Sequence, residues 1–254
     1  MLRLLPIRLW FAIAASWLTL AGVGFSAESV PTPDLIFIFI GQSNMAGRAP
    51  LLPEDRAPIP GAVLLNDQGQ WEPAANPLNR YASDRKALSM QRLGPGDGFA
   101  RQLHESLPGM TIGLVVNARG GTKIEEWARG QTLYENTLKR VRPLPKEKLA
   151  GVLWHQGEGN ARDPEYLDKL VALVGHLRQD LGRPDLPFVA GQVAGNPPVN
   201  GLIAQLPGKA ERTAWVSAEG LTVFDGVHFD RDSQKLIGRR YADAVLGLVK
   251  IEKQ

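Results

Sequence analysis

The chain of 254 residues predicts an α/β fold, a three-layer α/β/α sandwich around a central, mainly parallel five-stranded sheet. Two observations support this prediction. Short apolar runs rich in β-branched residues end abruptly at glycine or polar residues, which is typical of strands buried on both faces. Segments with apolar residues at helical spacing separate these runs, and strands that alternate with helices form βαβ units with parallel strands.

Five runs are expected to be the main strands. They cover residues 35–40, 111–116, 150–154, 188–193 and, with a weaker pattern, 214–217. A shorter run at 63–65 is followed by the turn residues Asn66, Asp67 and Gly69, which predict a small hairpin before Trp71.

Helical spacing predicts four helices, and a further helix is expected between the runs 188–193 and 214–217. The four are expected over residues 97–107, 133–141, 163–181 and 236–248. Asp97 is expected to cap the first helix, and Asp163 followed by Pro164 is a typical helix start. Gly182 is expected to close the helix that begins there. Residues 28–254 are therefore expected to form a single domain.

The first 27 residues have the layout of a secretory signal peptide. Arg3 and Arg8 precede an apolar stretch over 9–23, and small residues follow up to Ala27. Cleavage is expected after Ser26 or after Ala27. The apolar stretch is short for a membrane span of about 20 residues, so a secreted or periplasmic protein without stable membrane insertion is expected.

Composition excludes several function classes. Removal of Arg3 and Arg8 lowers the formal net charge from +3 to +1, and no basic stripe with interleaved aromatic residues supports nucleic-acid binding. Cysteine is absent, which excludes disulfides, thiolate metal sites and a cysteine nucleophile.

Polar residues follow three of the expected strands. The groups are Gln42-Ser43-Asn44, Arg119-Gly120-Gly121-Thr122 and His155-Gln156-Gly157-Glu158, and a fourth group, Asp225-Gly226-Val227-His228, precedes the last helix. The carboxyl ends of parallel strands meet at one edge of the sheet, where ligands bind. We therefore expect these groups to form one site.

Acyl transfer requires a nucleophile, a base, an orienting acid and donors for the oxyanion, and these groups contain candidates for each. Ser43 is the candidate nucleophile. Of the four histidines, His104 and His176 fall within expected helices. His228 fits the base, with Asp225 three residues earlier to orient it. His155, directly after a strand, is expected to support the site by hydrogen bonding.

The four blocks together resemble a known family. GQSNMAG at 41–47, NARGGT at 117–122, WHQGE at 154–158 and DGVHF at 225–229 are similar to the blocks of the SGNH (GDSL-type) hydrolase superfamily. Within it they resemble the sialate O-acetylesterase and carbohydrate esterase family 6 branch, which includes acetylxylan esterases. The resemblance runs from residue 35 to the last helix. It implies a flavodoxin-like three-layer fold, hydrolysis of acetyl esters on carbohydrates, and no metal or other cofactor.

Carried over by position, the resemblance assigns further roles. Ser43 matches the nucleophile, and the glycine of the second block matches the Gly120-Gly121 pair, with Gly121 preferred. The superfamily usually has an asparagine oxyanion donor in its third block. This sequence has Gln156 there, whose side-chain amide is expected to replace it beside the backbone N–H groups of Ser43 and Gly121.

One alternative for the acid remains open. Glu158 is a second carboxylate at the same edge, and it could orient His228 instead of Asp225 or alongside it. Asp225 is preferred because its three-residue spacing builds the contact locally. Glu158, His155 and Asn44 are otherwise expected to support the site.

Other motifs are incomplete. There is no G-x-S-x-G elbow, and the glycine-rich stretch 94–98 lacks the lysine of a phosphate-binding loop. His155 and Glu158 do not have the spacing of a zinc protease, so no metal is expected.

The sequence thus predicts a secreted serine esterase that acts on an acetylated carbohydrate. The alternatives are a non-catalytic carbohydrate-binding protein on the same fold and a serine esterase with a non-carbohydrate substrate. The segment 72–98 has few large apolar residues, which favours a polar sugar-binding surface over a lipid-binding lid. Trp71 and Trp127 are candidates for stacking on sugar rings.

Overall fold

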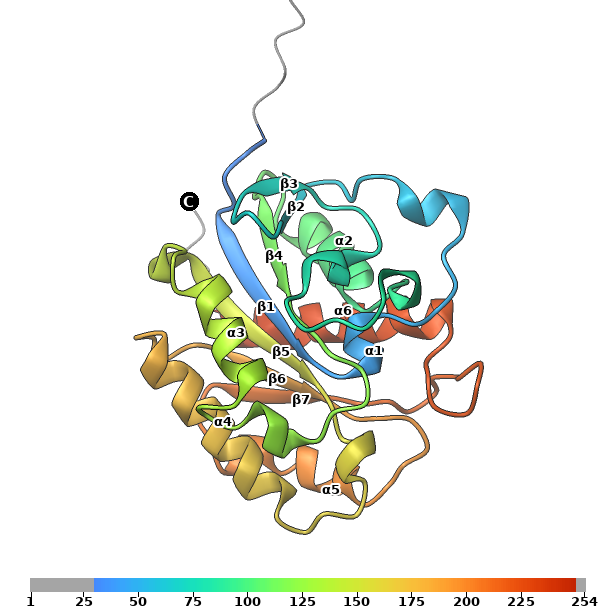
Figure 1. The fold of residues 1–254 in the computed structure, drawn as a ribbon, viewed down its shortest axis with the longest axis vertical. Helices are drawn as coiled ribbons and strands as arrows, with labels where there is room; N and C mark the ends of the chain where they lie inside the picture. Colours follow the sequence, from blue (N-terminus) through green and yellow to red (C-terminus); the bar gives the residue numbers. More distant parts are fainter. Residues whose placement is uncertain (1–29, 250–254) are drawn as a thin grey trace, which may run out of the picture.

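A computed structural model describes residues 30–249, and the predicted signal peptide lies outside this range. All seven strands belong to one sheet with the order β3-β2-β4-β1-β5-β6-β7 (Figure 1). Every neighbouring pair is parallel except β2 and β3, which form an antiparallel hairpin. The predicted class is therefore confirmed, with seven strands instead of five because the hairpin pairs with the main sheet.

The strands and helices alternate along the chain. The strands are β1 (Leu35–Gly41), β2 (Ala62–Leu65), β3 (Trp71–Pro73), β4 (Ile112–Val116), β5 (Leu149–His155), β6 (Phe188–Gly191) and β7 (Thr213–Val216). The helices are α1 (Ser43–Ala46), α2 (Gly96–Ser106), α3 (Thr132–Val141), α4 (Tyr166–Asp180), α5 (Val199–Ile203) and α6 (Arg231–Leu248).

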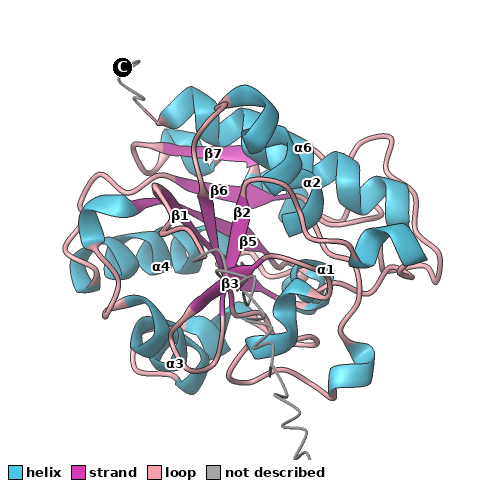
Figure 2. Cartoon of the chain, turned by 90° about the horizontal axis from the view of Figure 1, so that it is seen from above, coloured by secondary structure: helices cyan, strands magenta, loops and turns pink. Residues whose placement is uncertain are grey.

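Helices cover both faces of the sheet (Figure 2). The side chains of β1 alternate between two cores, as the pleat of a strand requires. Ile36, Ile38 and Ile40 pack with residues of α3, α4 and α5. Phe37 and Phe39 pack with residues of α2 and α6. Because both faces of β1 are buried, the strand is apolar throughout and lies at the centre of the sheet.

Two expected helix starts differ from the structure. Asp97 lies inside α2, where it is fully buried and accepts a hydrogen bond from Asn76 Nδ2, so it does not cap the helix. Asp163 accepts from the backbone N–H of Glu165, and α4 begins three residues after Asp163, at Tyr166. In both cases the carboxylate accepts a hydrogen bond, as its residue type predicts, but the aspartate does not occupy the N-cap position of the helix.

Within residues 30–249, no helix combines the length and the apolar character that a bilayer-spanning segment needs.

Candidate active site

The central position of β1 brings three of the predicted groups together. β4 and β5 flank β1 on either side, so the loops that follow these three strands are neighbours at the carboxyl edge of the sheet. Pairing continues beyond the strand ends, because Arg119 N donates to Gly41 O at 3.0 Å and Gln42 N donates to His155 O at 2.8 Å. Ser43 follows at the first position of α1.

The fourth group completes a chain of hydrogen bonds. His228 Nε2 lies 2.9 Å from Ser43 Oγ, and His228 Nδ1 lies 2.6 Å from Asp225 Oδ2. The other Asp225 oxygen accepts from the backbone N–H groups of His228 at 2.8 Å and Val227 at 3.1 Å. The three-residue spacing thus builds a turn in which Asp225 holds both the backbone and the ring of His228.

The electrostatics of this turn keep Asp225 ionised. The hydrogen bond from the His228 ring, followed by the one from the His228 backbone, lowers the pKa of Asp225 to about 2. Phe224 stacks on the imidazole with an interplanar angle of 27° and a centroid distance of 6.1 Å. The hydrogen bond to Asp225 and the stacking with Phe224 both hold the ring of His228, and its Nε2 is directed at Ser43 Oγ.

Asn44 connects the nucleophile to the histidine loop. It is buried, and its Nδ2 donates to Glu158 Oε1 at 2.8 Å and to Val227 O at 3.2 Å. Its Oδ1 accepts from Phe229 N at 3.0 Å and from Gln234 Nε2 at 3.2 Å. The residue after Ser43 therefore bonds to the backbone on both sides of His228.

Glu158 contacts Asn44 and makes no contact with the imidazole. Its Oε2 is buried and has no hydrogen-bond partner among the described residues, and burial raises its pKa to about 7. Since Asp225 makes the only carboxylate contact with His228 within residues 30–249, the geometry favours Asp225 over Glu158 as the orienting acid.

His155 lies beneath the site and is fully buried. The Tyr241 hydroxyl donates to Trp154 O at 2.7 Å, so the 3.0 Å contact between that hydroxyl and His155 Nδ1 requires an Nδ1–H on the histidine. Burial lowers the pKa of His155 to about 3, which keeps the ring neutral. Since its ring bonds to Tyr241 of α6 and to no catalytic residue, the supporting role stays a prediction.

Gln156 is not placed to serve as the oxyanion donor, which corrects the sequence-based prediction. The side chain is fully buried. Its Nε2 donates to Thr122 O at 3.0 Å and to Asn160 Oδ1 at 2.9 Å, which uses both amide hydrogens. The amide instead links the loops after β4 and β5, and Asn160, which the sequence reasoning missed, accepts the second bond.

Gly120 lies against the nucleophile, whereas the sequence favoured Gly121. A Cβ added at Gly120 would lie 3.3 Å from Ser43 Cβ, but one added at Gly121 would meet only Lys86 Nζ, at 3.4 Å. Among the described residues the backbone N–H groups of Ser43, Gly120 and Gly121 have no backbone acceptor, and Gly120 lies nearer to Ser43 than Gly121 does.

Arg48 is a further residue that the sequence reasoning missed. Only 8% of it is exposed, and its Nη1 donates to Gly47 O and Met90 O, each at 2.8 Å. It forms no ion pair with a carboxylate of residues 30–249. The only signal in the sequence was that a charged residue directly follows the block GQSNMAG at 41–47.

The two tryptophans named as sugar-stacking candidates lie elsewhere. Trp127 is buried edge-on against Trp154 and donates to Thr122 Oγ1. Trp71 is half-buried and packs over Gly113 of β4. Neither presents a free ring face at the catalytic centre.

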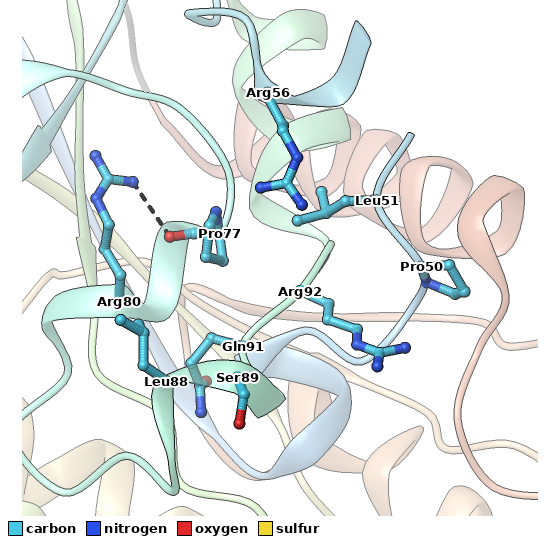
Figure 3. A pocket seen from close by; sticks show the side chains of 9 residues that line it. All are labelled: Pro50, Leu51, Arg56, Pro77, Arg80, Leu88, Ser89, Gln91 and Arg92. Carbon is cyan, nitrogen blue, oxygen red and sulfur yellow. Dashed lines mark hydrogen bonds between the residues drawn. The ribbon is translucent and has the colours of Figure 1, made fainter. Parts of the chain in front are cut away.

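A cavity of about 680 Å³ opens between the segments 50–56 and 77–92 (Figure 3). Arg56 and Arg92 belong to its wall, while Ser43, Asp225 and His228 do not. Within the described range, no cluster of three or more histidine, aspartate or glutamate side chains is arranged to hold a metal ion.

The fold and the site define an α/β protein in which a serine after the central strand and a histidine before the last helix lie within hydrogen-bond distance at one edge of the sheet. The chain belongs to the carbohydrate esterase, sialic acid-specific acetylesterase family, whose profile matches residues 33–247. Membership in this family makes the protein a carbohydrate esterase, and the predicted resemblance is confirmed.

Related proteins agree with this assignment. A probable carbohydrate esterase of Arabidopsis thaliana is 34% identical over 247 residues, which cover 86% of this chain and 93% of that protein. A crystal structure of an Arabidopsis thaliana protein superposes with a TM-score of 0.74 at 32% identity, covering 85% of this chain and 99% of the other. The crystal structure of NanS has the same fold, with a TM-score of 0.67 at 18% identity over 86% of this chain and 98% of NanS.

Proposed function

We propose that this protein is a serine esterase that removes acetyl groups from the hydroxyls of a carbohydrate through an acetyl-serine intermediate. One observation carries the proposal. The unbroken hydrogen-bond chain from Ser43 through His228 to Asp225 is the arrangement that turns a weakly nucleophilic hydroxyl into an attacking group.

Each residue of this chain has a distinct part in the proposed reaction. Ser43 Oγ attacks the ester carbonyl while His228 Nε2 accepts its proton. Asp225 holds the imidazole in the tautomer with a free Nε2 and stabilises the imidazolium. His228 then protonates the departing sugar hydroxyl, and it activates the water that hydrolyses the acetyl-enzyme.

The class of substrate and the location of the protein are also part of the proposal. The family description supports an acetylated glycan, either of the sialate type or of the acetylxylan type named by the sequence resemblance. The predicted signal peptide over 1–27 supports action outside the cytoplasm, as a secreted or periplasmic protein. No cofactor has a part in the proposed steps.

The test is acetate release from 4-nitrophenyl acetate, acetylated xylan and an O-acetylated sialoside. We expect Ser43→Ala to lose about 10³-fold or more in kcat, and Asp225→Asn about 10²–10⁴-fold, because each removes a part of one catalytic unit. Ser106→Ala, at an exposed serine near the end of α2, is the matched control and should be unchanged.

Two outcomes would contradict the proposal. Acetate release that survives in Ser43→Ala would assign the nucleophile to another residue. No release from any of the acetyl esters by folded wild-type protein would favour the alternative of a non-catalytic carbohydrate-binding protein.

A further inference from the structure

Arg48 carries a buried positive charge that no carboxylate of the described residues neutralises. Its Nη1 is engaged by two backbone carbonyls, those of Gly47 and Met90. Its Nη2 makes no hydrogen bond to a described residue and is not among the polar atoms sealed from solvent. Burial of an unpaired charge is costly, and such a group is expected where it meets a ligand of opposite charge.

The free nitrogen of Arg48 borders the nucleophile. A Cβ added at Gly120 would lie 2.6 Å from Arg48 Nη2 and 3.3 Å from Ser43 Cβ. The missing side chain of Gly120 therefore leaves a notch with Ser43 at one side and the guanidinium at the other. An ester whose carbonyl carbon bonds to Ser43 Oγ would place its carbonyl oxygen near this notch.

The surroundings of Arg48 add positive charge. Arg92 lies close enough to lower the pKa of the Arg48 guanidinium, although burial is the larger cause of that shift. Arg56 and Arg92 are among the residues that line the cavity between the segments 50–56 and 77–92 (Figure 3). The guanidinium of Arg48, with Arg92 near it, thus places positive charge beside Gly120, which favours a state of the reaction that carries negative charge.

We propose that Arg48 Nη2 donates a hydrogen bond to the oxyanion of the tetrahedral intermediate, the part for which the Gln156 amide is not free. The inference rests on the proposed function. As the bond from Ser43 Oγ to the carbonyl carbon forms, the carbonyl π electrons move to oxygen and the serine proton moves to His228 Nε2. Arg48 keeps its proton throughout, and the oxyanion collapses when the bond to the sugar oxygen breaks and His228 protonates that oxygen.

The test compares Arg48→Met and Arg48→Lys with wild type on 4-nitrophenyl acetate, which is uncharged. We expect Arg48→Met to lower kcat about 10²–10³-fold, as removal of one oxyanion donor does, with KM changed less than about threefold. Arg48→Lys should recover part of this loss, because an ammonium restores the charge. Arg56→Met, which removes an exposed arginine from the neighbouring cavity wall, should stay within about threefold of wild type.

A second measurement separates contact with the oxyanion from support of the loop. Methylboronic acid forms a tetrahedral anion with an active-site serine, so its inhibition constant should rise in Arg48→Met by about the same factor as kcat/KM falls. A purely structural effect would weaken this inhibitor no more than it weakens substrate binding. If Arg48→Met does not fold, as judged by thermal unfolding, Arg48→Lys carries both measurements.

Three results would overturn the inference. They are a kcat within threefold of wild type in Arg48→Met, an unchanged boronate inhibition constant, and a loss confined to substrates with a carboxylate, which would assign Arg48 to a charged group of the substrate. Failure of the proposed function itself would appear differently, as acetate release that does not depend on Ser43.

Discussion

The buried side chain of Glu158 lowers the stability of the folded protein by an amount that depends on pH. One of its oxygens accepts from Asn44, and the other is buried without a partner among the described residues. Burial raises its pKa from 4.5 to about 7 in the folded protein. Between these two values the folded state holds a proton that the unfolded chain has lost. Raising the pH through this window therefore favours unfolding, and above it the penalty is constant.

Glu158→Gln should remove this dependence, because the amide oxygen can still accept from Asn44 Nδ2 and does not titrate. We expect the variant to be more stable than wild type at pH 8 by at most about 3 kcal/mol, with the difference shrinking toward pH 4.5. Urea denaturation at pH 5, 6, 7 and 8 measures it. Glu105→Gln, at an exposed glutamate of α2, is the control, and equal pH slopes in Glu158→Gln and wild type would contradict the prediction.

At the residue scale, the sequence anticipated the partners whose contact depends on short spacing. His228 contacts Asp225 because three residues form one turn. It did not anticipate the partners of Gln156 or Glu158, since Thr122 lies 34 residues from Gln156 and Asn44 lies 114 residues from Glu158. A hydrogen-bond partner at such separation depends on which loops meet, and no local pattern encodes it.

Helices α2 and α6 are in close backbone contact at two glycines. α6 follows directly after the His228 loop, and it crosses α2 where Gly98 and Gly238 face the partner helix or its N-terminal flank. A Cβ at Gly98 would lie 2.1 Å from Lys235 O, and one at Gly238 would lie 2.2 Å from Pro95 O. The two backbones are therefore in direct contact, and this close packing sets the position from which the histidine loop returns to Ser43.

Gly238→Ala should destabilise the protein by about 1–3 kcal/mol, because the methyl group would push against backbone that has no room to yield. Gly247→Ala, on the same helix, is the matched variant, since a Cβ there would have no atom within 4 Å. It should stabilise the protein by about 0.5–1 kcal/mol through helix propensity. Thermal or chemical unfolding compares them, and equal effects would show that the crossing is not tightly packed.

At the scale of the elements, the spacing of apolar residues predicted which strands and helices exist, but it did not predict where each one begins and ends. The hairpin formed by β2 and β3 was predicted, whereas its pairing with β4 extends the sheet beyond the expected five strands. Asp97 was expected as a cap because its residue type favours that position. It is instead buried and accepts a hydrogen bond from Asn76, because the segment that precedes α2 folds back over the start of that helix.

At the scale of the whole molecule, the proposed catalytic groups come from segments far apart in the chain. Ser43 and His228 are 185 residues apart in sequence, and the parallel sheet brings their segments to one edge. Both of these residues, and Asp225, lie within the described range 30–249.

Export predicts a defined mature terminus. Expressed with residues 1–27 in a secreting host, the protein should be recovered outside the cytoplasm beginning at Ala27 or Glu28, because cleavage is expected after Ser26 or Ala27. Intact-mass spectrometry of the recovered protein measures this. A chain that starts before residue 26 and remains with the membrane fraction would instead indicate an uncleaved anchor. A variant lacking 1–27 should stay in the cytoplasm and keep the wild-type kcat.

The sequence by itself determined the α/β class, the four blocks, the family resemblance and the Asp225–His228 pair, since each is expressed in local spacing or in residue order. Only the tertiary structure decided that Gly120 faces Ser43, that Glu158 bonds with Asn44, that the Gln156 amide is occupied and that the Arg48 guanidinium borders Gly120. These contacts arise because β4 and β5 flank β1, and the packing of neighbouring loops then fixes which of several chemically suitable side chains reaches the serine.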